Sequence, residues 1–241
     1  MEGVIMSKFK IAVYADGASV DGMLEARDKW DVAGFTTNPS LMKKAGITDY
    51  VQFAKDALAA VNGLPLSFEV FSDDFEVMEE EAKKLAKLGD NVFVKIPITN
   101  SKGESSIPLI EKLSKSGVQI NITAILTIEQ VASVVKVLQQ GTHNIISVFA
   151  GRIADTGIDP IPLMKQAVAL TTQTPEAELL WASCREVLNI FQAQEIGVDI
   201  ITVTNAVLKK LSMVGKDPKQ LSLETVQGFH NDVEALGFSI L

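Results

Sequence analysis

The chain has 241 residues, of which 47% are hydrophobic, and it carries a formal net charge of −8 with a sequence pI near 4.9. The hydrophobic content argues against intrinsic disorder, and the acidic balance argues against nucleic acid or an anionic membrane as a partner. We expect a soluble cytoplasmic protein for three reasons: the chain has one cysteine, it has no apolar run of about 18 residues, and residues 1–10 lack the apolar core of a signal peptide.

Eight short apolar runs alternate with helical stretches along the chain. The predicted strands are 10–16, 33–38, 64–70, 91–97, 119–125, 145–150, 178–183 and 199–204. Capping boxes at Asp73 with Glu76, and at Thr127 with Gln130, predict the starts of two of the intervening helices. Gly89 is expected to end the first of them.

Strands that alternate with helices indicate parallel βαβ units. Eight units in 241 residues predict a (β/α)₈ TIM barrel, which we expect to form a single domain over 1–241. The alternative is an open doubly wound sheet, although no G-x-G-x-x-G or P-loop motif favours a nucleotide-binding version. The tail from about Ser222 predicts one extra C-terminal helix followed by a loose end.

One face of nearly every predicted strand ends in polar residues, because side chains alternate between the two faces of a strand. From the first strand to the eighth, these residues are Asp16, Asn38, Glu69, Lys95, Asn121 with Thr123, Ser147, and Thr202 with Thr204. The carboxyl ends of the strands are the catalytic face of such barrels. The alternative is the solvent face of an antiparallel sheet, which the intervening helices and the lack of hairpin turns disfavour.

Lys95 lies in the middle of the apolar stretch NVFVKIPI, where a charged residue is rarely buried unless it is paired. Burial disfavours the charged form of an amine, and a neutral amine forms Schiff bases with carbonyls. We therefore expect Lys95 to attack a ketone, with a buried ion pair to Glu69 or Asp16 as the alternative. Asp16 would be the base at the breaking C–C bond, and Glu69 with Thr123 and a water would form the second acid/base.

Basic side chains follow the sixth and seventh predicted strands, near the place where barrels commonly bind phosphate. Arg152 follows the sixth strand, and Ser183 and Arg185 follow the seventh. Because arginine forks suit phosphate oxygens, we expect a phosphate pocket here. A surface salt bridge is the alternative for either arginine taken alone.

No metal site is expected from the sequence. His143 precedes the sixth strand and His230 lies in the tail, and neither has a neighbour at the spacing of metal ligands. Cys184 has no histidine nearby in the sequence, so we interpret it as a packing residue.

Six segments together resemble the transaldolase family of Schiff-base barrels. They are GFTTNPSL (34–41), LSFEVF (66–71), VFVKIPIT (92–99), INITAI (120–125), SVFAGRIAD (147–155) and LWASCRE (180–186). The resemblance implies a (β/α)₈ fold without metal or cofactor. It also implies transfer of a three-carbon dihydroxyacetone unit from sedoheptulose 7-phosphate or fructose 6-phosphate to an aldose phosphate, in the pentose phosphate pathway.

The resemblance also implies roles for particular residues. Lys95 would be the Schiff-base lysine and Asp16 the acid/base, and Glu69 with Thr123 would relay protons through a water. The implied substrate contacts are Asn38, Asn121 and Ser147, with Arg152, Ser183 and Arg185 around the phosphate. Phe149 lies on the inward face of the sixth strand, and its ring is expected to form part of the pocket wall around the enamine intermediate on Lys95. The partners expected are sugar phosphates and further copies of the chain, since barrels expose helices that often pair.

The sequence departs from the family at several points. Gly17 stands where the family usually has a small hydroxyl residue, and Glu186 stands where the long transaldolases tend to carry Asn. The chain is also shorter than those enzymes. The natural substrates can therefore differ from the usual pentose-phosphate sugars.

Fructose-6-phosphate aldolases share most of these motifs but carry Gln at the position of Glu69 and Tyr at that of Phe149. The sequence therefore favours a transferase over a lyase of that kind. A third hypothesis is a catalytically silent barrel that binds sugar phosphates. The joint presence of Lys95, Asp16 and Glu69 argues against a silent barrel. Borohydride trapping with a ketose phosphate distinguishes an enzyme from a binding protein, because a binding protein gains no mass.

Overall fold

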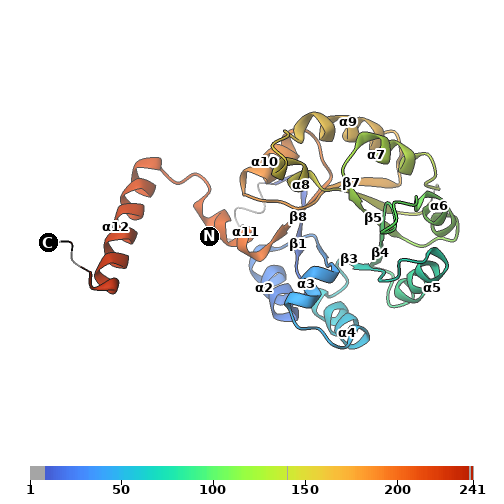
Figure 1. Cartoon of the computed structure of the whole chain (residues 1–241), viewed down its shortest axis with the longest axis horizontal. Helices are drawn as coiled ribbons and strands as arrows, with labels where there is room; N and C mark the ends of the chain where they lie inside the picture. Colours follow the sequence, from blue (N-terminus) through green and yellow to red (C-terminus); the bar gives the residue numbers. More distant parts are fainter. Residues whose placement is uncertain (1–8, 140, 239, 241) are drawn as a thin grey trace.

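Eight parallel strands close into a barrel in the computed structural model, which describes residues 9–139, 141–238 and 240 (Figure 1). The strands are β1 Ala12–Asp16, β2 Gly34–Thr36, β3 Leu66–Glu69, β4 Val92–Pro97, β5 Ile120–Ile125, β6 Asn144–Val148, β7 Ala177–Trp181 and β8 Ile200–Thr204. Each strand pairs with its neighbours in sequence, and β8 pairs with β1. The predicted TIM barrel is confirmed, and both the open sheet and the antiparallel sheet are wrong.

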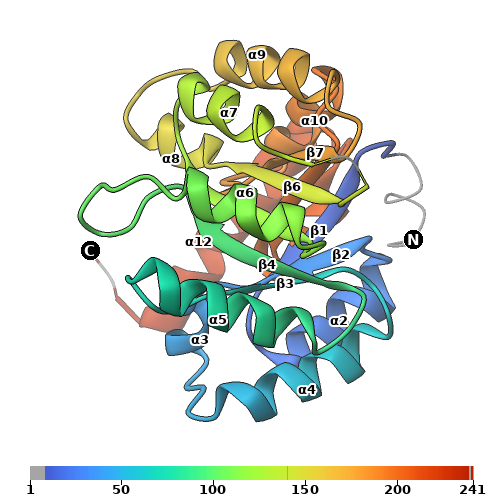
Figure 2. The same ribbon diagram turned by 90° about the vertical axis from the view of Figure 1, so that its right-hand side faces the viewer.

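Helices cover the outside of this barrel, as the side view in Figure 2 shows for α5, α6, α7 and α9. The helices are α2 Val20–Trp30, α3 Pro39–Lys44, α4 Tyr50–Val61, α5 Phe75–Ala86, α6 Ile107–Lys115, α7 Ile128–Val135, α8 Ala150–Asp155, α9 Ile161–Thr171, α10 Leu188–Glu195, α11 Asn205–Lys210 and α12 Pro218–Leu236, with a short 3₁₀ turn at Leu211–Met213. The outward faces of the strands and the inward faces of the helices share one large apolar core.

A second apolar cluster fills the inside of the barrel. Its buried members are Tyr14, Phe93, Ile145, Leu180, Ala182 and Ile200. The ring of Tyr14 crosses the backbone of β2 at Gly34, where an added Cβ would lie 2.6 Å from the ring. Glycine is therefore required at this position, and the barrel interior is a packed core rather than a channel.

Local capping follows the sequence at two helix starts. Asn38 is extended, with φ −158°, and its side chain accepts a hydrogen bond from the backbone N–H of Leu41, while Pro39 takes the first helical position. The reciprocal capping box between Thr127 and Gln130 is also present. Both helix starts therefore use side chains to satisfy backbone groups that the helix itself leaves free.

The start and the end of α5 differ from the prediction. Asp74 caps this helix and accepts hydrogen bonds from the backbone N–H groups of Glu76 and Val77. Asp73 instead accepts two hydrogen bonds from Ser101, one from its backbone and one from its hydroxyl, each 2.6 Å long. The helix ends at Ala86, so the prediction that Gly89 ends it is wrong. Its C-cap residue, Lys87, has a right-handed backbone with φ −75°, and no glycine is required there.

The predicted C-terminal helix is present but begins earlier than expected, since Asp217 caps it and Pro218 takes its first position. Figure 1 shows α12 standing away from the barrel, to which α11 connects it. None of the 19 residues of α12, all of them described, is buried. Within the described part of the chain, no helix has the length and apolar content needed to span a membrane. The expectations about residues 1–10 and the loose end fall mainly on 1–8, 239 and 241, outside the described residues.

Candidate active site

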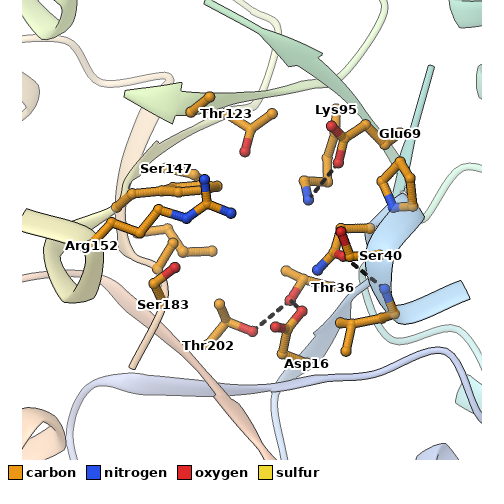
Figure 3. Close-up of a pocket in the computed structure, with 17 residues that line it drawn as sticks. Asp16, Thr36, Ser40, Glu69, Lys95, Thr123, Ser147, Arg152, Ser183 and Thr202 are labelled. Atoms are coloured by element: carbon orange, nitrogen blue, oxygen red, sulfur yellow. Dashed lines mark hydrogen bonds and ion pairs between the residues drawn. The ribbon is translucent and has the colours of Figure 1, made fainter. Parts of the chain in front are cut away.

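A pocket with a volume of about 440 Å³ opens at the carboxyl ends of the strands (Figure 3). Side chains at or near the strand ends line it: Asp16, Thr36, Glu69, Lys95, Thr123, Ser147, Phe149 and Thr202. Loops and helix starts contribute Asn38, Ser40, Arg152 and Ser183. The inward polar face that the strand pattern predicted therefore surrounds one cavity.

Lys95 lies in the wall of this pocket with only 7% of its side chain exposed. Its Nζ is 3.0 Å from Oε2 of Glu69 and donates a hydrogen bond of 2.7 Å to the backbone carbonyl of Thr37. The buried ion pair considered as an alternative is thus present, with Glu69 rather than Asp16. Because both partners line the pocket, the pair also fixes the position of the amine beside the cavity.

Asp16 ends β1 on the same cavity and belongs to a chain of hydroxyl groups. The hydroxyl of Thr36 donates to Oδ1 of Asp16 at 2.7 Å, and the hydroxyl of Thr202 lies 2.6 Å from that of Thr36. Burial raises the pKa of the Asp16 carboxyl, while the charge of Lys95 and the Thr36 hydrogen bond oppose the shift. A carboxyl with a raised pKa can hold or release a proton closer to neutral pH, which suits acid/base work.

Thr123 presents a buried hydroxyl that has no hydrogen-bond partner among the described residues. The next residue, Ala124, has a left-handed backbone with φ 60°, and the pairing of β5 with β6 shifts register between Ile122 and Ile125. Such irregularities re-aim side chains next to active sites. A ligand or water in the pocket would satisfy the hydroxyl of Thr123.

Asn121 lies beneath the pocket rather than in its lining. It is fully buried, donates to the hydroxyl of Ser67 at 3.0 Å, and accepts a 2.6 Å hydrogen bond from the hydroxyl of Ser147. Ser147 does line the pocket. Asn121 therefore holds the hydroxyl of Ser147, and direct contact with a ligand stays a prediction for Asn121, Ser147 and Asn38.

Arg152 brings positive charge to the rim. Its guanidinium lies 4.9 Å from the centre of the Phe149 ring, and Figure 3 shows it extending into the cavity. Ser183, on the loop after β7, lines the same rim with a left-handed backbone of φ 59°. A Cβ on Gly151, in α8, would lie 1.6 Å from the carbonyl oxygen of Ser183. The backbones of α8 and of the loop after β7 can therefore approach only because residue 151 is glycine.

Arg185 is not brought into the pocket lining. Its guanidinium pairs with both carboxylate oxygens of Asp155, with Nε 3.1 Å from Oδ1, and half of each side chain is exposed. The surface salt bridge considered as an alternative is therefore present for Arg185. Of the three residues predicted around the phosphate, Arg152 and Ser183 come together and Arg185 stands apart.

Three polar lining residues carried no predicted role, namely Thr36, Thr202 and Ser40. The alternation of side chains had already placed Thr36 and Thr202 on the inward face, so that signal was available in the sequence. Ser40 is in the first turn of α3, and its approach to the pocket depends on how that helix leaves β2. The sequence pattern carries no such information.

Within the described residues, no group of three or more His, Cys, Asp or Glu side chains could hold a metal ion. His143 precedes β6 and lies 2.5 Å from Oε2 of Glu178, near the opposite end of the barrel. Cys184 is buried, and its thiol donates to the carbonyl of Glu186. Burial raises the pKa of this thiol to about 12, which keeps it protonated and unreactive.

Comparison with known proteins gives a family match over nearly the whole chain. The model of the "Transaldolase/Fructose-6-phosphate aldolase" family matches residues 13–240. A probable transaldolase from Ruegeria sp. (strain TM1040) is 33% identical over 229 residues, covering 95% of this chain and 99% of the relative. A probable transaldolase from Thermoanaerobacter sp. (strain X514) is also 33% identical, over 199 residues, covering 82% of this chain and 88% of the relative.

Among solved structures, dihydrodipicolinate synthase from Rhodopseudomonas palustris is similar with a TM-score of 0.57. The match covers 94% of this chain and 80% of that chain at 10% sequence identity. A likeness at this level of identity concerns the fold alone, and it agrees with the closed barrel described above.

Proposed function

The chain belongs to the transaldolase/fructose-6-phosphate aldolase family, and from this membership we propose that it transfers a dihydroxyacetone unit between sugar phosphates. The donor would be a ketose phosphate, sedoheptulose 7-phosphate or fructose 6-phosphate, and the acceptor an aldose phosphate of the pentose phosphate pathway. The observation that carries the proposal is the buried amine of Lys95, held 3.0 Å from Glu69 in the wall of a pocket that also contains Asp16.

The first proposed step joins the donor to Lys95. Glu69 takes a proton from the ammonium group, and the free amine attacks the ketone carbon to give a carbinolamine. The carbinolamine then loses its hydroxyl as water, with Glu69 returning the proton through a water held at Thr123. The unpartnered hydroxyl of Thr123 on the same cavity supports this assignment.

The second proposed step breaks the Cα–Cβ bond, which is one bond away from the iminium carbon. Asp16 takes the proton of the hydroxyl on the departing fragment, which leaves as an aldehyde, and the bond electrons move to the iminium to form an enamine. The acceptor aldehyde then reacts with the enamine, and Asp16 returns its proton to the new alkoxide. Water finally hydrolyses the new iminium, by the reverse of the first step, and frees the product ketose and the amine of Lys95. The raised pKa of Asp16 supports this role, because the residue must hold a proton between the two half-reactions.

Arg152 and Ser183 are the proposed contacts for the substrate phosphate. Both line the rim of the pocket, and the guanidinium of Arg152 is already directed into it (Figure 3). Charge-assisted hydrogen bonds from a guanidinium are roughly twice as strong as neutral ones. This arrangement supports phosphorylated sugars over their unphosphorylated counterparts.

Phe149 supports transfer rather than simple cleavage. A transferase must keep the enamine unprotonated until the acceptor arrives, and a phenyl ring on the pocket wall has no proton to give. The alternative is a lyase that releases free dihydroxyacetone, as the family description allows. Both functions pass through the same adduct on Lys95. They differ in what happens to the enamine, which reacts with an acceptor aldehyde in a transferase and is protonated and released in a lyase.

The test is borohydride trapping with fructose 6-phosphate, followed by peptide mapping. We expect one reduced ketose fragment on Lys95, and no adduct in Lys95→Arg, because arginine does not deprotonate in proteins. Lys112→Arg, an exposed lysine that pairs with Glu79, is the matched control and should trap like the wild type. An adduct on another lysine, or no adduct at all, would refute the Schiff-base role.

We also propose that the chain assembles with further copies of itself, through α12. Apolar side chains at Val226, Phe229, Val233 and Leu236 recur every three or four residues and form one stripe along this helix, each more than half exposed. Each strand of the barrel is followed by its own helix, so α12 is additional to the ring. Every copy carries the same unpaired stripe, and a symmetric assembly can bury it.

Light scattering on the full chain tests this assembly. The wild type is expected to be larger than a monomer, and Phe229→Glu should shift it toward the monomer. Gln227→Glu adds the same charge on the opposite side of α12 and should leave the mass unchanged. A monomeric wild type, or equal effects of both changes, would contradict the proposal.

A further inference from the structure

The short helix α8 connects the pocket to an ion pair outside it. Arg152 and Asp155 are three residues apart on this helix, so their side chains are neighbours on one face. Arg152 lines the pocket, whereas Asp155 binds the guanidinium of Arg185 through both carboxylate oxygens. The second arginine is thus held one helical turn away from the first.

The backbone at Arg185 is fixed independently of its side chain. Oδ1 of Asn189 accepts hydrogen bonds from the backbone N–H of Arg185 at 3.0 Å and from that of Glu186 at 3.1 Å. Ser183, two residues before Arg185, lines the pocket rim. The loop therefore keeps the backbone of Arg185 near the rim, while its side chain is half exposed and held by Asp155 alone among the described side chains.

The fork of Arg185 can bind either a carboxylate or a phosphate, because each offers two oxygens to its parallel N–H donors. Exposed ion pairs contribute little to stability, and the side chains of Asp155 and Arg185 are 52% and 50% exposed. A phosphate dianion carries more charge than a carboxylate and offers three oxygens. It can therefore compete with Asp155 for this guanidinium.

We propose that Asp155 sets the preference of the pocket for phosphate by holding the fork of Arg185 outside it. A phosphate at the rim takes the fork from Asp155, and Arg185 then joins Arg152 and Ser183. Asp155 is therefore a specificity-determining residue that acts through Arg185. This inference rests on the proposed function and deepens it, because it names the residue that controls how strongly the rim binds the substrate phosphate.

Asp155→Asn tests the inference, since it removes the charge and keeps the shape. Inorganic phosphate is titrated calorimetrically into the full-length wild type and variant, a measurement that needs no activity. We expect the Kd for phosphate to fall about two- to fivefold, which corresponds to the usual strength of an exposed ion pair. The KM for fructose 6-phosphate should fall in parallel, and that for unphosphorylated fructose should not change.

Two further variants isolate the route of the effect. Adding Arg185→Gln to Asp155→Asn should abolish the gain, because the freed fork is gone. Glu186→Gln removes the same charge from the neighbouring loop and should give no gain. An unchanged or weaker phosphate affinity in Asp155→Asn, a gain that survives in the double variant, or an equal gain in Glu186→Gln would each overturn the inference.

The outcome is separable from that of the proposed function. Failure of Lys95 to form an adduct with fructose 6-phosphate would refute the Schiff-base chemistry and leave the phosphate titration unaffected. If Asp155→Asn does not fold, Asp155→Ser also removes the counter-charge, and the same two outcomes apply to it. Melting temperatures of all variants confirm that the folded protein is being titrated.

Discussion

The two halves of the barrel interior use the same strands and the same strand face, yet one is an apolar plug and the other a polar pocket. The change occurs within two residues along four strands: Tyr14 to Asp16, Phe93 to Lys95, Ile145 to Ser147, and Ile200 to Thr202. The apolar cluster lies directly beneath the polar residues on these strands, and burial is the main cause of the raised pKa of Asp16. The chemistry proposed above thus depends on side chains that would take no part in it.

The sharpest test of this comparison changes the pocket and leaves the plug intact. Asp16→Asn should lower turnover by about 10²–10⁴-fold, the usual contribution of a general acid/base. Because burial raises the pKa of this carboxyl, folding disfavours its ionisation, and this cost grows as pH rises from about 3.8 through the raised value. The variant carries no such charge and should melt at a higher temperature than the wild type at pH 7.

Activity and thermal unfolding of the same preparations provide the measurement. Asp90→Asn, in the exposed turn before β4, is the control and should alter neither quantity. A variant that loses activity and also melts lower than the wild type would show that Asp16 stabilises the fold, against the division described above.

The second test breaks the plug. Phe93 is 2% exposed, and its removal in Phe93→Ala should lower the free energy of unfolding by about 3–5 kcal/mol, as for other buried aromatic residues. Urea unfolding measures this loss. Phe191→Ala, where the ring is 38% exposed, should lose clearly less. Equal losses at the two positions would mean that the interior cluster is no more important than the surface.

The third test changes the wall of the pocket by a single hydroxyl. Phe149→Tyr should raise the release of free dihydroxyacetone from fructose 6-phosphate without acceptor and lower transfer, because a phenol can orient a water toward the enamine. Part of the 10²–10⁴-fold effect of general acid assistance is expected, so a several-fold change is measurable. If the wild type already releases dihydroxyacetone as fast as it transfers it, the lyase alternative stands.

The smallest expected effect lies at the far end of the plug, where the ring of His143 packs edge-on against Phe93 at 5.3 Å. The hydrogen bond with Glu178 raises the pKa of His143. The stability from this pair is fully present below about pH 6.5 and is lost as pH rises through the raised value. Solvent exposure limits it to about 1 kcal/mol or less.

Melting temperatures at pH 5.5 and pH 9 measure this contribution. The wild type should lose more stability over that range than His143→Gln, which cannot be protonated. Identical pH profiles would show that the pair adds nothing to the plug.

The order of the strands and helices was predictable because each depends on local signals. Period-two alternation marks a strand, and residues such as Asn38 with Pro39 mark a helix start, wherever they occur. Local signals also explain the errors: Asp73 and Asp74 are adjacent candidates for one cap. The choice between them depends on Ser101, 28 residues away, which binds Asp73.

The lining of the pocket was less predictable. It depends on how deep in the barrel a residue lies, as well as on which face of its strand carries the side chain. Asn121 and Lys95 are paired in register on the same inward face, yet the long side chain of Lys95 lines the cavity and the short one of Asn121 does not. The orientation of Arg185 depends on Asp155, 30 residues earlier in the chain. The alternation of side chains along a strand gives no information on the stagger between strands. It also does not indicate which partner a long side chain will bind.

The contact between Gly151 and Ser183 couples the start of α8 to the loop after β7, so the two segments must be compatible with each other. A Cβ at residue 151 would lie 1.6 Å from the carbonyl oxygen of Ser183, so a replacement of the segment after β6 keeps this packing only if it also carries glycine there. Chimeras between this chain and a relative should therefore cross over outside residues 149–185. Within that interval, a change in one loop restricts which changes the other can accept.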